Sequence, residues 1–485
     1  MANSNNSVIT GKFRGNLGKL KDPPVPTDSD TPKLGNRNPT HWLLWFLWRF
    51  TLTYLSISQT TVKRIAAAIT LKPAFAFSDK IPFYMKRLIL FMAILLLFSA
   101  EILRVYFVMP FPGSQVSNTV SFAYWLDQSI VWIRVLALFL LCFSLISVFK
   151  NGRVWEKVLL SLIGLSYAFI FFIFNFRLQA ENIFHQPVNK SFTVASNSAM
   201  EKSKLIIGVV IGGQAKAYPI QLIGYHHQVM DTIGKTPVMI TYCTVCRSGR
   251  VYSPIVNGKL ESFRLVGMDH FNAVFEDATT KSWWQQATGT SIAGPLKGYQ
   301  LKEFPSTQLT WDAWLREYPE SLVMKPDTIF MDNYFKLEDY DKGTMLSNLV
   351  RRDIVSWEPK SWIVGVKNNF SSKAYDWNEL VQKRIIQDSV DRLPILLTIE
   401  NDSTSFHVYD RRVNNSVLRF QIAGNNDLLV DNMTNSTWNM DGVCIGGLLK
   451  GKKLLPVQSY NEFWHSWQTF HNNAKIYVGN YTVIK

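Results

Sequence analysis

The sequence predicts membrane helices, three of them transmembrane, followed by a β-rich α+β extracytoplasmic region made of two tandem related domains. Three observations lead to this fold class. Three long stretches of Leu, Ile, Phe and Val lie in the first third of the chain. Short β-branched and aromatic runs closed by Gly, Asn or Pro dominate the remainder. The last 280 or so residues repeat one pattern at a nearly constant spacing.

The three apolar stretches, residues 88–109, 130–149 and 158–174, are each about long enough to cross a bilayer. Glu101 and Arg104 lie three positions apart in the first stretch, so we expect them to pair on one helix face. Arg134 is expected near a helix end, where it can reach the membrane interface. The lipid bilayer is therefore one predicted partner.

Basic residues predict the orientation, because Lys and Arg near membrane spans stay on the cytoplasmic side. The loop 110–129 contains no Lys or Arg, whereas the loop between the second and third spans contains Lys150, Arg153 and Lys157. We expect a protein of the bacterial inner membrane with its N-terminus in the cytoplasm and residues 177–485 in the periplasm.

Composition divides the chain into seven predicted segments. Residues 1–40 are rich in Pro, Asn, Ser and Lys, which is typical of a disordered tail. The full set is a cytoplasmic tail (1–40), an interfacial segment (41–80), a three-helix membrane domain (81–176), a linker (177–204), a first repeat domain with the CxxC (205–330), a connector (331–361) and a second, degenerate repeat domain (362–485).

The net charge of +15 does not indicate nucleic-acid binding. Residues 1–176 carry 18 basic and 7 acidic residues, a net charge of +11, and the remainder carries only +4. The basic character therefore belongs mainly to the membrane segment, and we expect no nucleic-acid partner.

The internal repeat gives a comparison within one chain. Ile207-Gly208-Val209 returns 157 residues later as Val364-Gly365-Val366, and after a four-residue contraction Trp311 and Trp314 return as Trp464 and Trp467. Residues that build the fold should appear in both copies, so the shared glycines and tryptophans indicate scaffold and core. A site is expected among the polar residues without a like-for-like partner in the second copy. They are His226, His227, Cys243, Cys246, Arg250, His270, Glu276 and Asp277.

A predicted hairpin brings a cysteine towards a histidine. Two strands around Gly234-Lys235-Thr236 would pair residues whose numbers sum to about 470, so Cys243 should face His226 or His227. Side chains directly opposed in a hairpin have Cβ atoms about 5 Å apart, which lets Cys and His bind one metal ion. Thiolate and imidazole together favour copper or zinc, and Cys243, Cys246, His226 and His227 are the predicted ligands.

The motif Cys243-Thr244-Val245-Cys246 has three interpretations: a metal half-site, a redox dithiol or a structural disulfide. The chain continues from the motif into another predicted strand, which resembles a metal knuckle more than a thioredoxin site, where a helix follows. A zinc site normally needs four ligands, so histidine or carboxylate would have to complete it. The sequence leaves all three interpretations open.

Three further residues are candidates for general acid–base catalysis. His270, Glu276 and Asp277 follow the CxxC and could supply a base or further ligands. The alternative is that they stabilise a turn through hydrogen bonds.

Several motifs occur in a fixed order in residues 205–325: His226-His227-Gln228, Tyr242 to Cys246, Ser282-Trp283-Trp284-Gln285 and Gly294 to Gly298. In this order they resemble a bacterial family called domain of unknown function 3179. The family's usual Tyr-Cys-Pro-Leu-Cys appears here with Thr244 and Val245 between the cysteines, and its usual His-Glu pair appears as His226-His227. The resemblance implies domain identity and candidate sites, and its name implies no activity.

Two functions from different classes remain. The first is a membrane-anchored periplasmic metalloprotein or redox enzyme centred on the CxxC, acting on an unidentified small molecule. The second is a non-enzymatic binding or assembly module with a membrane-protein partner, in which the CxxC is a structural disulfide.

Overall fold

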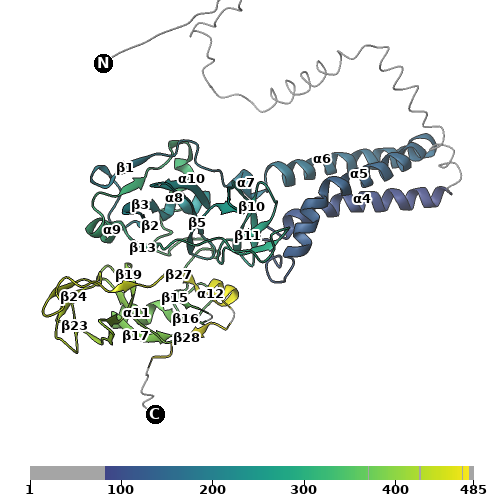
Figure 1. Cartoon of the computed structure of the whole chain (residues 1–485). Coiled ribbons are helices and arrows are strands. Elements are labelled where there is room, and N and C mark those ends of the chain that lie inside the picture. Colours follow the sequence, from purple (N-terminus) through teal and green to yellow (C-terminus); the bar gives the residue numbers. More distant parts are fainter. Residues whose placement is uncertain (1–81, 370, 425–427, 472, 480–485) are drawn as a thin grey trace, which may run out of the picture. The chain divides into compact units, whose positions relative to one another are not determined.

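The computed structural model describes residues 82–485 except 370, 425–427, 472 and 480–485 (Figure 1). The predicted tail (1–40) and the predicted interfacial segment (41–80) therefore lie outside the described residues.

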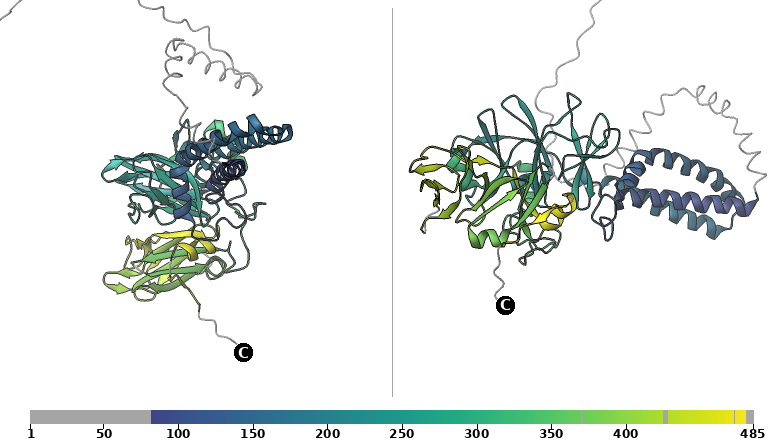
Figure 2. Two further views of the ribbon diagram at one scale, coloured as in Figure 1. Left: turned by 90° about the vertical axis from the view of Figure 1, so that its right-hand side faces the viewer. Right: turned by 60° about the horizontal axis from the view of Figure 1, so that its bottom comes forward.

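Three long helices open the described chain and lie side by side (Figure 2). They are α4 (Phe83–Tyr106), α5 (Val120–Asn151) and α6 (Val154–Phe176), and all three are long and apolar enough to cross a membrane. Helix α5 begins ten residues earlier than the apolar stretch indicates. Its first turns contain Asp127, whose charge interrupts the apolar pattern in the sequence. The helix nevertheless includes this residue, because Asp127 is paired with Arg104 of α4.

The charged residues inside this bundle pair differently from the prediction. Glu101 does not pair with Arg104; it accepts hydrogen bonds from Arg134 of α5 at 2.6 and 2.7 Å and from Asn175 of α6 at 2.9 Å. Arg134 therefore lies against the bundle interior and not at the interface. A charge among apolar helices needs a partner, and a bidentate guanidinium on the neighbouring helix provides a better one than a residue on the same helix.

The β-rich region begins with a five-stranded sheet in the order β1-β14-β3-β2-β13. The segment predicted as a linker supplies β1, which pairs with β14 and so ties this segment into the sheet. The strands are β1 (Phe192–Val194), β2 (Leu205–Ile211), β3 (Gln214–Pro219), β13 (Thr307–Thr310) and β14 (Leu322–Met324).

Two smaller sheets follow in the same part of the chain. One is β4 (Gln228–Ile233), β5 (Thr236–Cys243) and β6 (Ser248–Tyr252). The other is β9 (Phe263–Asp269), β10 (Asn272–Asp277), β11 (Trp283–Gln285) and β12 (Ser291–Ala293). The short helices are α7 (Ala180–Ile183), α8 (Ile220–His226), α9 (Trp311–Glu317) and α10 (Met331–Phe335). We call residues 205–330 the N-terminal half.

Residues 362–485, the C-terminal half, contain sheets of matching order. Strands β15 (Trp362–Asn368) and β16 (Ser371–Asp376) pair in the register of β2 and β3, since Val209 faces Lys216 and Val366 faces Lys373. The remaining main elements are α11 (Trp377–Lys383), β17 (Ile385–Val390), β18 (Leu393–Ile399), β19 (Phe406–Asp410), β22 (Phe420–Ile422), β23 (Leu428–Asp431), β24 (Thr437–Asn439), β25 (Cys444–Gly446), β27 (Ser459–Phe463), α12 (Trp464–Phe470) and β28 (Lys475–Ile476).

A glycine–tryptophan contact recurs in both halves. A Cβ atom placed on Gly208 would lie 2.2 Å from the ring of Trp314, and one placed on Gly365 would lie 2.3 Å from the ring of Trp467. Each tryptophan is buried and packs directly on the backbone of a strand. The prediction that these shared residues form the core is confirmed for both pairs.

Candidate functional site

The hairpin that carries the first cysteine differs from the predicted one by a single residue. Strands β4 and β5 pair Gln228 with Thr241 and Asp231 with Val238, so the numbers sum to 469. The turn contains two residues, Gly234 and Lys235, and not three. The paired strand β4 begins at Gln228, because the chain before it is helix α8.

The ring of His226 is held by groups other than the cysteines. His226 ends α8, where Nδ1 lies 2.5 Å from the carbonyl oxygen of His185 and Nε2 lies 2.7 Å from the hydroxyl of Tyr334. Both ring nitrogens are thus in hydrogen bonds. The predicted hairpin pairing of Cys243 with His226 is wrong, because helix α8 ends at His226 and the paired strand begins only at Gln228. Their sharing of one metal ion stays a prediction.

His227 is also held by other groups. Its Nδ1 lies 3.3 Å from the carbonyl oxygen of Tyr225, and its ring centroid is 4.4 Å from that of Phe184. Burial lowers the pKa of His227 to about 4. Within the part of the chain that the structure describes, no three-residue metal-ligating group includes His226, His227 or the two cysteines.

The two cysteines share one hydrogen-bond acceptor. Cys243 and Cys246 are both fully buried free thiols, and each Sγ donates to the carbonyl oxygen of Phe271 at 3.4 Å. Phe271 and His270 form the two-residue turn between β9 and β10, where Asp269 faces Asn272. Both turn residues have positive φ, 49° and 64°, as a type I′ turn requires. The turn therefore aims one carbonyl group at both thiols.

The C-terminal half and the chain before it complete the surroundings of the thiols. The ammonium group of Lys360 donates to the carbonyl oxygen of Val245 at 2.6 Å, and it interacts electrostatically with both thiols. His465, near the start of α12, interacts electrostatically with Cys246. Its Nδ1 lies 2.9 Å from the carbonyl oxygen of Pro359, and its Nε2 is buried with no hydrogen-bond partner among the described residues.

The thiols have unequal proton affinities. Burial raises the pKa of Cys243, but a hydrogen bond from Cys246, backbone hydrogen bonds and the charge of Lys360 outweigh it and lower the pKa below its usual value. Burial, together with the neighbouring Cys243, raises the pKa of Cys246 well above its usual value. Burial lowers the pKa of Lys360 to about 8. Cys243 is therefore the thiol that ionises first.

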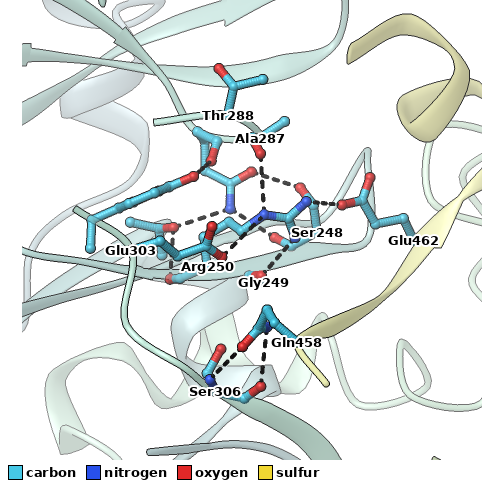
Figure 3. Close-up of polar contacts among 12 residues, drawn as sticks. Ser248, Gly249, Arg250, Ala287, Thr288, Glu303, Ser306, Gln458 and Glu462 are labelled. Atoms are coloured by element: carbon cyan, nitrogen blue, oxygen red, sulfur yellow. Dashed lines mark hydrogen bonds and ion pairs between the residues drawn. The ribbon is translucent and has the colours of Figure 1, made fainter. Parts of the chain in front are cut away.

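A buried ion pair joins the two halves beside this site (Figure 3). The guanidinium of Arg250, on β6, donates to Glu462 of β27 and to the carbonyl oxygen of Ala287 at 3.1 Å. Its carbon Cζ also lies 3.7 Å from the ring centroid of Tyr460. Arg250, which was singled out because the second copy lacks it, thus fixes β6 against the C-terminal half.

The predicted catalytic residues have other contacts. His270 Nδ1 lies 2.9 Å from Asp269 Oδ1 within the turn described above. Glu276 accepts hydrogen bonds from Arg264 at 2.8 Å and from the indole of Trp283 at 3.0 Å, and no described hydrogen bond links it to a thiol. Through Arg264, which also lies 3.5 Å from Asp127 of α5, Glu276 connects the sheet to the membrane helices.

Asp277 has a structural counterpart that the sequence comparison missed. Its carboxylate accepts from Thr280 and from the indole of Trp284 at 2.9 Å. Asp431 accepts in the same way from Thr434 and from the indole of Trp438 at 3.0 Å. Because both halves keep the arrangement, it indicates a scaffold turn.

Sequence reasoning missed Lys360 and His465. Lys360 lies in the predicted connector, and His465 lies in the half that was expected to be degenerate. The repeat did contain a signal for His465. It is the equivalent of Asp312, 153 residues earlier, so the two copies have different polar residues directly after the shared Trp311 and Trp464.

Comparison with known proteins gives one match. The family described as a protein of unknown function (DUF3179) matches residues 185–474, a wider range than the 205–325 of the expected resemblance. No curated protein matches the chain, and no solved structure matches it.

Proposed function

Because the chain belongs to the DUF3179 family of proteins of unknown function, we propose its function from the site: a membrane-anchored thiol redox protein that cycles Cys243 and Cys246 between dithiol and disulfide. The observation that carries this proposal is the shared acceptor of the two thiols. Both Sγ atoms lie 3.4 Å from the carbonyl oxygen of Phe271.

Unequal thiols suit disulfide exchange. The thiolate is the nucleophile, so a cysteine with a lowered pKa attacks first. Cys243 has this property, and Cys246, which keeps its proton longer, resolves the mixed disulfide. Lys360 stabilises the thiolate electrostatically.

The proposed reaction is a thiol–disulfide exchange between Cys243 and Cys246 and a disulfide-bearing partner. The Cys243 thiolate attacks one sulfur of a disulfide, whose S–S bond breaks and whose second sulfur leaves as a thiolate. Cys246 then releases its proton and displaces the attached sulfur, which closes the Cys243–Cys246 disulfide. Two electrons pass to the partner, and the two protons of the original thiols end on its two sulfurs. The partner is a disulfide-bearing small molecule or membrane protein.

The test uses the full chain in detergent with Cys142 and Cys444 changed to Ser. The protein is equilibrated in buffers of graded dithiol–disulfide potential, its free thiols are alkylated, and the mass is measured. We expect a two-electron transition and, in the reduced protein, faster alkylation at Cys243 than at Cys246. Thiols that remain reduced at every potential, or a disulfide that excess dithiol does not reduce, would contradict the proposal.

The buried, unpaired Nε2 of His465 favours a second candidate, a copper or zinc site made by Cys243, Cys246 and His465. The three ligand atoms do not all lie within 4.8 Å of one another in the described residues, so this candidate requires the imidazole or a thiol to move when the ion binds. Two thiolates and an imidazole suit either metal. The metal content of the same purified chain separates the candidates. A metal ion present at one per chain and lost in His465→Ala supports this candidate, whereas a metal-free chain with the redox transition supports the first.

The wider organisation is part of the same proposal. We assign residues 205–330 and 362–485 to two related domains, on the matching strand register and the shared Gly–Trp contacts. The distribution of Lys and Arg supports an inner-membrane protein with residues 177–485 in the periplasm. A structural disulfide in a binding module is the least favoured alternative, because both thiols are free and the C-terminal half builds the same strand pairing without them.

A further inference from the structure

Three metal-ligating side chains converge in the C-terminal half, away from the thiols. Glu400, His407 and Asp441 each offer a ligand atom within 4.8 Å of the other two. His407 Nε2 lies 3.1 Å from Glu400 Oε1 and 3.9 Å from Asp441 Oδ1. We propose that this triad binds a divalent metal ion, such as zinc or manganese, and forms a second site independent of the CxxC.

The backbone holds the triad in place from three elements. Glu400 directly follows β18, His407 lies in β19 opposite Thr398, and Asp441 follows β24. The loop between β18 and β19 is fixed by Asp402, whose carboxylate accepts from the backbone N–H of Ser405 at 2.7 Å. Ligands held by strand ends and a capped loop are positioned before any ion binds, which reduces the entropic cost of binding.

The second oxygen of Glu400 is already oriented. Arg316, from helix α9 of the N-terminal half, donates to Glu400 Oε2 and also to Asp312 at 3.0 Å. Glu400 Oε1 lies 3.1 Å from His407 Nε2, so an ion bound by both atoms would replace the proton between them. A hydrogen-bonded outer partner that orients a ligating carboxylate is a usual feature of metal sites.

The triad lies beside open space. Glu400 and Asp441 line a cavity of about 700 Å³, and His407 and Asp441 line a neighbouring cavity of about 360 Å³. Three protein ligands next to a cavity leave coordination positions for water or a substrate, as in catalytic zinc sites. Imidazole and carboxylate ligands without a thiolate also suit manganese.

The charge around the cavity favours a cation. The lining of the larger cavity contains four carboxylates, Asp312, Glu400, Asp402 and Asp441, against two basic residues, Lys202 and Arg316. The competing interpretation is an ion pair between protonated His407 and Glu400, which needs no metal.

The experiment titrates the full chain in detergent with Zn²⁺ and, separately, with Mn²⁺, followed by calorimetry and by the unfolding temperature. Cys243 and Cys246 are changed to Ser throughout, so that neither thiol contributes to binding. We expect one ion per chain and a rise in the unfolding temperature. His407→Gln and Asp441→Asn should each weaken binding by more than about tenfold.

Ser203→Ala is the control, because exposed Ser203 lines the same cavity but is not part of the triad. Its affinity should stay within a few-fold of the parent, and all variants should keep the parent's unfolding temperature in chelator to within a few degrees. Binding of neither metal, binding that survives His407→Gln, or an equal loss in Ser203→Ala would each overturn the proposal. None of these results bears on the thiol redox proposal, because the thiols are absent throughout.

Discussion

In the N-terminal half, β5 ends at the thiol of Cys243, and Cys246 follows three residues later. At the equivalent positions, 157 residues further along the chain, the C-terminal half has the carboxylate of Glu400 and the hydroxyl of Ser403. The strands that lead to both positions share one pairing register, since Gln228 faces Thr241 and Ile385 faces Thr398. The difference teaches that the same backbone framework accommodates either thiols or oxygen-bearing side chains at the end of this strand. We infer that the framework and the chemistry of the site are separable in this chain.

Each half also contributes a helix to the other half's site. Helix α12 of the C-terminal half carries His465, which acts on Cys246, and helix α9 of the N-terminal half carries Arg316, which binds Glu400. These helices follow strands that occupy matching edges of their sheets, β27 and β13. Each proposed site therefore includes a side chain from the other half.

The largest expected effect comes from the buried ion pair between the halves. Glu462→Gln should lower the free energy of unfolding by about 3–5 kcal/mol, because the buried Arg250 then keeps only the partly exposed Glu303, 3.8 Å away, as a counter-charge. Chemical denaturation of the full chain in detergent measures this loss. The double variant Arg250→Met/Glu462→Met removes both charges and should recover part of it. A loss below about 1 kcal/mol in Glu462→Gln would show that the pair does not hold the halves together.

A smaller loss of stability, equal in the two halves, is expected when the glycine of each Gly–Trp contact is replaced. Gly208→Ala and Gly365→Ala should each cost about 1–3 kcal/mol, because the new methyl group would overlap the ring of Trp314 or Trp467. Unfolding temperatures measure both changes. Gly164→Ala, whose Cβ would meet nothing within 4 Å, is the control and should change little. A loss in only one half would argue against a common scaffold.

The smallest effect concerns the thiols alone. Lys360→Gln removes a positive charge that favours the Cys243 thiolate, so alkylation of reduced Cys243 should become slower at pH 7 and its midpoint should move to higher pH. In the parent, this stabilisation is present below about pH 8 and fades as Lys360 loses its proton above it. Alkylation rates measured from pH 5 to 10 test this. The exposed Lys297→Gln should leave the profile unchanged, and an unchanged profile in Lys360→Gln would remove Lys360 from the site.

The sequence predicted those parts of the fold that depend on local pattern. The β-branched run at residues 205–211 forms β2, and the three long apolar stretches form helices α4, α5 and α6. These helices are long and apolar enough to cross a membrane, although α5 starts earlier than predicted because Asp127 interrupts the apolar run. Pattern was sufficient in these cases because burial on one face repeats every two or 3.6 residues.

The site was only half predictable. The cysteines stand out in the sequence, but the expected histidine depended on a hairpin register, where one residue decides which side chain faces which. Lys360 and His465 reach the thiols from more than 100 residues away, and no local pattern records such a contact. Asp277 was singled out for lacking a counterpart, because the four-residue contraction hid Asp431 from the alignment.

The loop between α4 and α5 has a consequence for the thiols. The carbonyl oxygen of Val108 accepts from the backbone N–H of Met268 at 2.7 Å, and the side chain of Gln115 accepts from the backbone N–H of Phe271 at 3.1 Å. The turn whose carbonyl group both thiols share is thus held by the loop between α4 and α5. A fragment that begins after α6 lacks this support, so we expect its thiols to lose a fixed acceptor. A tilt of α4 and α5 would move the same acceptor.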